Sequence, residues 1–335
     1  MSIEQLEEIA QAMVAEGKGI IVIDESSATC KKRFDGVGIE CTEETRRNYR
    51  EMLLTVPNLR DYISGAILYD ETLRQSTRAG VPFTKVMMDN GILPGIKVDK
   101  GPVPLAGFPG EVVTEGLDGL RDRLKEYAKL GAKFAKWRAV ININDDAPSG
   151  TCIEANCHVL ARYAALCQEA GIVPMVEPEI LMDGDHDIEV CYDVTEATLR
   201  SLFGALYEHN VMLEGTILKA SMVISGKDCP EQASIEEVAE MTLRCLKATV
   251  PATLPGIVFL SGGQSDELAT AHLNEINQYD TPWPVSFSYG RAMQQAALKL
   301  WAQDMAGNFA KAQQTVFERA RDNGLAALGT WRSAA

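Results

Sequence analysis

Eight short apolar segments alternate along the chain with stretches of helical periodicity. Most of their residues are β-branched and each segment ends in polar or charged residues, which is typical of parallel strands covered on both faces. The segments span residues 19–24, 64–70, 95–99, 134–141, 173–180, 215–219, 256–263 and 285–290. This alternation predicts eight strands connected by helices.

Eight such strands in 335 residues fit a single (β/α)8 TIM barrel, which typically has about 250 residues and tolerates insertions. A doubly wound open sheet is the alternative, but its usual Gly-x-Gly-x-x-Gly fingerprint is absent after Ile23. No Ser/Gly linker or low-complexity segment divides the chain. We therefore expect one α/β domain over 1–335, with an extra N-terminal helix that covers the barrel bottom and a helical C-terminal extension with a short tail at 306–335.

Helical periodicity also predicts the larger helices. Thr42 starts one, with Glu43 and Glu44 in its first turn, where acidic side chains interact favourably with the helix dipole. The acidic run at 183–187 lacks the glycine and distal glutamate of an EF-hand loop, so we interpret it as a turn and helix cap. Later helices are expected near 117–131, 150–170, 196–209, 234–248, 265–277 and 291–323.

Composition excludes several classes of protein. With 47 acidic against 32 basic residues, the net charge of −15 disfavours binding to nucleic acid or to an anionic membrane. There is no leader-like N-terminus and no apolar run of membrane-spanning length, so a cytoplasmic protein is expected. The eight cysteines include no Cys-x-x-Cys pair and the four histidines no His-x-x-x-His spacing. We expect free thiols, no metal and no cofactor.

The charged residues fall at the strand ends. Residues two apart share one face of a strand, so Lys136 points with Arg138, and Glu177 points with Glu179. Because barrel active sites form at the carboxyl ends of the strands, these side chains are expected to converge on one pocket. Ion pairs that plug the barrel are the structural alternative, but buried pairs are often no more stabilising than apolar packing. So many charges at the strand ends therefore favour a catalytic site over a structural one.

Lys219 ends the sixth segment in apolar surroundings. Its ammonium group could reach the surface, as many strand-end lysines do. Burial and a nearby cation instead lower a lysine pKa from about 10.4 toward 7–8, where the free amine attacks a carbonyl carbon. Lys136 and Lys219 flank Glu177, which can exchange protons, and Asp24 can act on a substrate hydroxyl. The pattern predicts Schiff-base chemistry on a carbonyl substrate.

Two groups of anion-binding residues follow from the same strand ends. The loops after the seventh and eighth strands are where TIM barrels often bind phosphate, and here they carry Ser261, Gly262, Gly263, Ser288, Gly290 and Arg291. A second set of donors comes from Ser26, Thr29, Arg33, Lys97 and Arg138. Two anion-binding ends separated by a lysine and carboxylates indicate a doubly phosphorylated sugar.

Several long motifs together resemble the class I fructose-bisphosphate aldolases of animals and plants, over residues from about 4 to about 325. The matching segments are 24–26, 68–73, 95–101, 104–107, 116–119, 134–138, 171–180, 183–187, 213–219, 259–265 and 287–291. The resemblance implies cleavage of fructose 1,6-bisphosphate in glycolysis and gluconeogenesis, and a homotetramer. The same chemistry on sedoheptulose 1,7-bisphosphate and a non-catalytic binding scaffold are the alternatives. A metal-dependent aldolase is disfavoured by the histidine spacing.

The resemblance also implies roles for single residues. Lys219 would form the Schiff base, Glu177 would transfer protons with Glu179 and Lys136 as its electrostatic partners, and Asp24 would take the hydroxyl proton during carbon–carbon cleavage. One phosphate would bind Ser261, Gly262, Gly263, Ser288, Gly290 and Arg291. The other would bind Ser26, Thr29, Arg33, Lys97 and Arg138, with threonine at 29 where the family has another hydroxyl residue.

The C-terminal residues differ from the family pattern. Animal and plant members end in a tyrosine that assists proton exchange at the enamine carbon, whereas residues 330–335 contain none. We expect Glu177, water or another residue to protonate the enamine. Trp331 could fill the corresponding space, although an indole has no useful acid–base chemistry near neutral pH.

Overall fold

Eight parallel strands close into one barrel in this computed structural model, which describes residues 3–144 and 148–333. The order around the barrel is β1-β10-β9-β8-β7-β6-β3-β2. The barrel strands are β1 (Gly19–Ile23), β2 (Ile63–Leu68), β3 (Leu93–Lys97), β6 (Phe134–Ile141), β7 (Val173–Ile180), β8 (Ile217–Ala220), β9 (Ile257–Phe259) and β10 (Val285–Tyr289). The predicted TIM barrel is confirmed.

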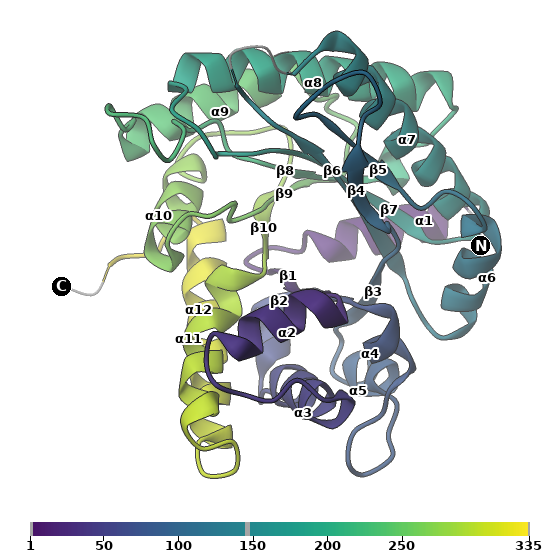
Figure 1. Cartoon of the computed structure of the whole chain (residues 1–335), viewed down its shortest axis with the longest axis vertical. Helices are drawn as coiled ribbons and strands as arrows, with labels where there is room; N and C mark the ends of the chain where they lie inside the picture. Colours follow the sequence, from purple (N-terminus) through teal and green to yellow (C-terminus); the bar gives the residue numbers. More distant parts are fainter. Residues whose placement is uncertain (1–2, 145–147, 334–335) are drawn as a thin grey trace.

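Helices surround the barrel, as Figure 1 shows. They are α1 (Ile3–Met13), α2 (Ser27–Asp35), α3 (Glu43–Leu54), α4 (Asp70–Arg74), α5 (Phe83–Asp89), α6 (Leu120–Lys129), α7 (Gly150–Glu169), α8 (Ile188–Glu208), α9 (Ile235–Thr249), α10 (Asp266–Ile276), α11 (Arg291–Gln303) and α12 (Phe309–Ala327). Short 3-10 turns lie at Leu59–Asp61 and Leu213–Gly215. Thr42 caps α3 through a reciprocal capping box with Thr45.

The structure corrects two predicted helices. The single helix expected over 291–323 is wrong, because α11 ends at Gln303 and α12 begins at Phe309. In the break, Asp304 accepts hydrogen bonds from the backbone N–H groups of Ala306 and Gly307, which competes with helical bonding. The helix expected to start near 196 begins at Ile188.

The acidic run at 183–187 caps that earlier start of α8. Asp187 is its N-cap residue and accepts a hydrogen bond from the backbone N–H of Val190 at 2.9 Å. The interpretation of this run as a turn and helix cap is therefore confirmed.

Several elements had not been predicted, among them α4 and α5, and two of the others lie near predicted site residues. Helix α2 follows β1 directly, with Ser26 as its N-cap. A two-stranded antiparallel hairpin, β4 (Gly101–Pro104) with β5 (Val112–Glu115), follows β3 outside the barrel. Both start beside predicted site residues, so each adds backbone close to the mouth.

The apolar core is divided into two layers by strand alternation. Outward-facing strand residues, such as Ile21, Trp137 and Leu218, pack against the surrounding helices. Inward-facing residues at the amino ends of the strands form a separate cluster that α1 covers, and its members include Met13, Ile20, Phe134, Met175, Ile217 and Val258. In Figure 1, α1 lies behind the strands. The predicted role of the N-terminal helix as a cover of the barrel bottom is confirmed.

Other expectations from composition concern cysteines and membranes. All eight cysteines are free thiols, as predicted. Most are buried, and burial raises the pKa of the Cys157 thiol to about 12, which keeps it protonated. Within the described residues, no helix is both long enough and apolar enough to cross a membrane.

Candidate active site

Four charged side chains meet at the carboxyl ends of the strands. Lys219 Nζ lies 3.0 Å from Glu177 Oε1, and Lys136 Nζ lies 3.3 Å from Glu177 Oε2. Lys136 Nζ also lies 2.7 Å from Asp24 Oδ2. The side chains of Lys136, Glu177 and Lys219 are only 4% exposed. The predicted neighbourhood of these four residues is thus present.

Strand register explains why these residues meet. Met175 of β7 pairs with Ile217 of β8, so the residues two positions further along, Glu177 and Lys219, are level and share the inward face. On the other side of β7, β6 contributes Lys136. Asp24 directly follows β1 and reaches Lys136 across the mouth. Four strands that are distant in sequence therefore supply one cluster.

Opposite charges decide the ionisation of the cluster. Burial alone would raise the pKa of Asp24, but the ammonium of Lys136, with smaller effects of Lys219 and Lys97, holds that pKa below its usual value. Glu177 follows the same logic, because Lys136, Lys219 and Arg138 outweigh burial and lower its pKa. Burial would lower the pKa of Lys136, but Asp24, Glu177 and Asp99 raise it. Both carboxylates are ionised near neutral pH, and Lys136 is a fixed cation.

A second ring of charges lies around this cluster. Arg138 forms an ion pair with Glu179, so the observed partner of Glu179 is this arginine. Lys97 Nζ contacts Asp99 Oδ1 at 2.6 Å, and Asp99 Oδ2 accepts a hydrogen bond from the backbone N–H of Arg138 at 3.3 Å. The carboxylates of Asp99 and Glu179 thereby orient cations that border the mouth.

The loops after β9 and β10 lie side by side. A Cβ atom built on Gly263 would lie 3.8 Å from Arg291 Nη2, so the two predicted anion-binding loops are adjacent. Gly262 and Gly263 have φ of +42° and +88°, a backbone conformation that favours glycine. Gly290 is the N-cap of α11 and has no side-chain capping bond. Its uncapped helix start adds backbone donors beside the exposed Arg291.

Ser288 adds a hydroxyl group to these loops. It is 1% exposed, and its Oγ has no hydrogen-bond partner among the described residues. A buried hydroxyl without a partner is costly, so a bound acceptor at this position would be favourable. Ser261 is also buried, and it lies just after β9, the strand that pairs with β10.

The opposite donor set is built on the first turns of α2. Ser26 Oγ accepts from the backbone N–H of Thr29 and lies 3.1 Å from Thr29 Oγ1. Arg33 forms an ion pair with Glu25. Sequence reasoning missed Glu25 and its other partners, although a glutamate next to Asp24 on the opposite face of the chain was a usable signal.

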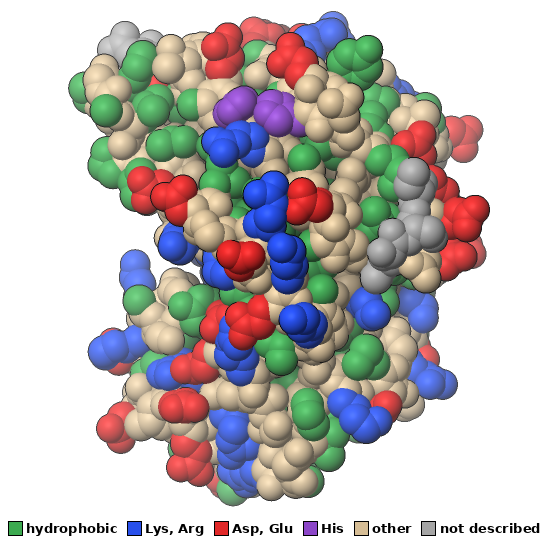
Figure 2. All heavy atoms as spheres, turned by 90° about the vertical axis from the view of Figure 1, so that its right-hand side faces the viewer, with side chains coloured by type: hydrophobic (Ala, Val, Ile, Leu, Met, Phe, Trp, Pro, Cys, Tyr) green, Lys and Arg blue, Asp and Glu red, His purple; other side chains and the backbone are tan. Residues whose placement is uncertain are grey.

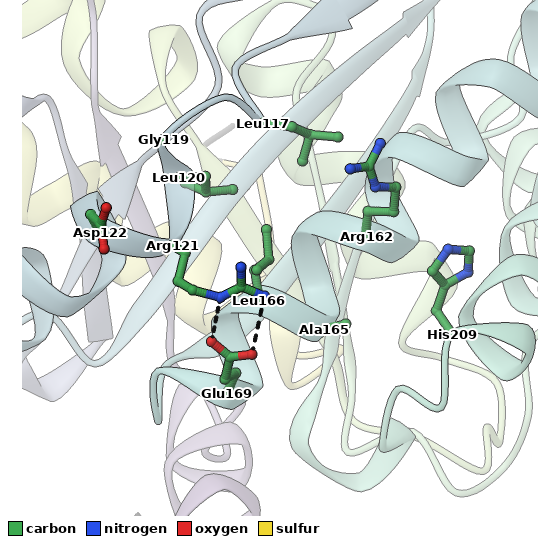
Figure 3. A pocket seen from close by; sticks show the side chains of 10 residues that line it. All are labelled: Leu117, Gly119, Leu120, Arg121, Asp122, Arg162, Ala165, Leu166, Glu169 and His209. Atoms are coloured by element: carbon green, nitrogen blue, oxygen red, sulfur yellow. Dashed lines mark hydrogen bonds and ion pairs between the residues drawn. The ribbon is translucent and has the colours of Figure 1, made fainter.

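The surface has a hollow at the mouth of the barrel and a second hollow elsewhere. The mouth of the barrel faces the viewer in Figure 1. In the side view of Figure 2 the mouth is therefore on the left, where the edge of the molecule is hollowed at mid-height. A separate hollow of about 470 Å³ lies on the outer surface beside α6 and α7 (Figure 3). There Arg121 is paired with Glu169 at 2.7 Å, and none of the lining residues is a predicted site residue. The chemistry therefore belongs to the mouth.

Trp331 lies far from the mouth. Its backbone N–H donates to Asn274 Oδ1 at 2.9 Å, near the end of α10. In a (β/α)8 barrel, the carboxyl end of a helix lies at the bottom, where the next strand begins. The alternative in which this indole fills space in the site is wrong.

These observations define a class of protein: a TIM-barrel enzyme whose buried lysine, held against a carboxylate, can form a Schiff base with a carbonyl substrate. The family model described as fructose-bisphosphate aldolase class-I matches residues 5–335. The chain therefore belongs to the class I fructose-bisphosphate aldolase family, whose members are carbon–carbon lyases.

Individual relatives agree over nearly the whole chain. A probable fructose-bisphosphate aldolase class 1 from Xanthomonas campestris is 77% identical over 99% of this chain and 100% of its own length. Fructose-bisphosphate aldolase 4, cytosolic, from Arabidopsis thaliana is 52% identical over 94% of this chain and 81% of its own. The solved fructose-bisphosphate aldolase from Plasmodium falciparum, in complex with TRAP and a small-molecule inhibitor, has a TM-score of 0.97 at 47% identity and covers 99% of this chain and 96% of its own.

Proposed function

We propose that this enzyme reversibly cleaves fructose 1,6-bisphosphate to glycerone phosphate and glyceraldehyde 3-phosphate through a Schiff base on Lys219. The observation that carries the proposal is the buried contact of 3.0 Å between Lys219 Nζ and Glu177 Oε1. A carboxylate at that distance can remove a proton from the ammonium and leave the amine nucleophilic. Family membership supports the substrate.

The residues take successive roles in this proposal. Lys219 Nζ attacks the C2 carbonyl, and Glu177 returns a proton so that the carbinolamine loses water and forms an iminium ion. Asp24 removes the C4 hydroxyl proton, the C3–C4 bond breaks, and its electron pair moves into the iminium to give an enamine. Protonation at C3 and hydrolysis release glycerone phosphate. Lys136 and Glu179 hold the surrounding charges in place.

Two anion-binding ends fit the two phosphates. Ser261, Gly262, Gly263, Ser288, Gly290 and Arg291 would bind the phosphate nearest the carbonyl. The partnerless Ser288 hydroxyl and the uncapped start of α11 support this assignment. Ser26, Thr29, Arg33, Lys97 and Arg138 would bind the distal phosphate.

Chemical trapping tests the proposal. Incubation with glycerone phosphate followed by borohydride reduction is expected to add one label, which mass spectrometry will place on Lys219. Lys227→Met is the matched control, because Lys227 is an ion-paired but half-exposed lysine outside the cluster. EDTA is expected to leave activity unchanged, since the protonated imine supplies the electron sink. Label on another lysine would overturn the mechanism.

Assembly and location are proposed from family membership. We infer a cytoplasmic homotetramer that acts in glycolysis, supported by the family match and by the relative named as cytosolic. Sedimentation equilibrium of the purified protein will test the tetramer. Fractionation of the source cells will test the location.

A further inference from the structure

Glu25 occupies a buried position immediately after Asp24 but on the opposite side of the chain. Asp24 reaches into the mouth, whereas Glu25 contacts side chains from α2, α3 and α11. In Figure 1 these three helices lie together beside β1. Glu25 therefore links the first strand to a layer of helices behind the distal phosphate end.

Three groups share the Glu25 carboxylate. Its Oε1 accepts from Arg33 Nη1 and from Gln294 Nε2, the latter at 2.6 Å. Its Oε2 lies 2.8 Å from Arg50 Nη2. Two arginines thus face one carboxylate, which leaves this cluster with one excess positive charge near the distal phosphate end.

Exposure separates the two arginines. The Arg50 side chain is 2% exposed and that of Glu25 is 4% exposed, whereas Arg33 is 28% exposed. Breaking a buried pair is strongly unfavourable, but an ion pair that solvent reaches is worth little. Arg50 is therefore the permanent partner of Glu25, and Arg33 is the exchangeable one.

The cluster already contains replacements for Arg33. Within the described residues, Nε and Nη1 of Arg50 have no hydrogen-bond partner, although both are buried. The Gln294 amide is fixed in orientation, since its Oε1 accepts from the Tyr49 hydroxyl and its Nε2 donates to the Val22 carbonyl and to Glu25. Glu25 would remain hydrogen-bonded after Arg33 leaves, because Arg50 has spare donors and Gln294 stays in place.

The direction in which Arg33 would move follows from α2. Ser26, Thr29 and Arg33 are separated by three and four residues, so they follow one face of the helix start. The two hydroxyl groups already lie 3.1 Å apart. A phosphate held by them would lie on the same face as the guanidinium of Arg33.

We propose that Glu25 is a specificity-determining residue: it restrains Arg33 in the unliganded enzyme, and only a substrate with a distal phosphate removes Arg33 from it. In this proposal, binding of that phosphate breaks the Glu25–Arg33 pair, so the pair reduces the advantage of a bisphosphate over a monophosphate. This inference rests on the proposed function, because it takes the Ser26 end as the distal phosphate site.

Kinetic comparison of two substrates tests it. Glu25→Gln is expected to lower the KM for fructose 1,6-bisphosphate by about three- to tenfold. The KM for fructose 1-phosphate, which lacks the distal phosphate, should stay unchanged. Glu71→Gln is the control, because it removes a carboxylate that is paired with an arginine of the same helix α3, Arg46, without removing a partner of Arg33. An unchanged ratio of the two KM values in folded Glu25→Gln would contradict the proposal.

Crystal structures of the wild-type enzyme provide a test that does not depend on folding of the variant. With an unreactive hexitol 1,6-bisphosphate, Arg33 should leave Glu25 and contact the distal phosphate; with hexitol 1-phosphate it should stay on Glu25. A distal phosphate bound at Ser26 and Thr29 while Arg33 remains on Glu25 would overturn this inference and leave the aldolase assignment intact. Failure of the enzyme to cleave the bisphosphate would instead overturn the proposed function.

Discussion

The two ends of the barrel interior are built by the same strands and differ completely in chemistry. At the bottom, Phe134, Met175 and Ile217 point inward and pack under α1. Two residues further along each strand, on the same face, stand Lys136, Glu177 and Lys219. A step of two residues, about 6.6–6.8 Å, separates a dry apolar plug from a charged cluster.

This difference assigns separate tasks to the two ends. Apolar burial at the bottom stabilises the fold in proportion to the area removed from water. The charges at the mouth gain little stability, because desolvation offsets most of their attraction. They are maintained in fixed positions by mutual pairing, which is what proton transfer requires. Substitutions at the mouth should therefore affect catalysis, and substitutions at the bottom should affect stability.

Among these substitutions, Glu177→Gln at the mouth is expected to have the largest effect on catalysis. Turnover should fall by roughly 10²–10⁴-fold, the usual cost of losing a general acid–base group. Glu169→Gln is the control, since it removes a carboxylate paired with Arg121 in the outer hollow. Steady-state assays with circular dichroism will measure both. Normal turnover in Glu177→Gln would show that proton transfer lies elsewhere.

Met13→Ala tests the opposite end. Met13 is fully buried on α1, in the apolar cluster beneath the barrel, so its truncation should lower the free energy of unfolding by about 2–5 kcal/mol. Turnover at 25 °C should change less than twofold. Met305→Ala, at an exposed methionine, is the control for urea unfolding. A large loss of turnover in folded Met13→Ala would break the division between the two ends.

A pH effect on stability is expected on the mouth side. Burial lowers the pKa of His272, which hydrogen-bonds Gln264 in the loop after β9, to about 4. Between pH 6.5 and about 4 the unfolded chain binds the proton and the native state does not, so stability falls as pH falls through this window. Because of His272, the free energy of unfolding should fall by roughly 2 kcal/mol between pH 6.5 and 5.

Urea unfolding of His272→Gln at pH 7 and pH 5 will measure that contribution. The variant should lose roughly 2 kcal/mol less than wild type between the two pH values. His209→Gln serves as the control, because His209 is a partly exposed histidine on the outer face, where its ring contacts His158. An identical pH dependence in wild type and His272→Gln would contradict the assignment.

The smallest effect is expected at the rim of the mouth. Arg291→Ala should raise the KM for fructose 1,6-bisphosphate about tenfold, equivalent to about 1.4 kcal/mol, with turnover within about threefold of wild type. The control is Arg121→Ala, at an exposed arginine of the outer hollow. If turnover rather than KM falls, Arg291 acts in the chemistry and the distinction between rim and cluster must be redrawn.

Several features followed from local sequence patterns. The β6 and β7 strands have the predicted bounds, and their period of two residues correctly placed Lys136 and Glu177 on inward faces. The Ser-Gly-Gly and Gly-Arg segments indicated neighbouring loops because barrel topology brings the ends of consecutive strands together. The break at Asp304 was missed, since a side-chain hydrogen bond to the local backbone overrode helical periodicity.

The amino-acid sequence alone determined the eight strands of the barrel and the identity of the charged residues at its mouth, because these depend on periodicities of two and 3.6 residues along the chain. Only the tertiary structure decided which charges pair. It joined Glu179 to Arg138, and it placed Glu25 between Arg33 and Arg50. These partners come from separate elements, and the distances and burial that set their energies exist only after the barrel has closed.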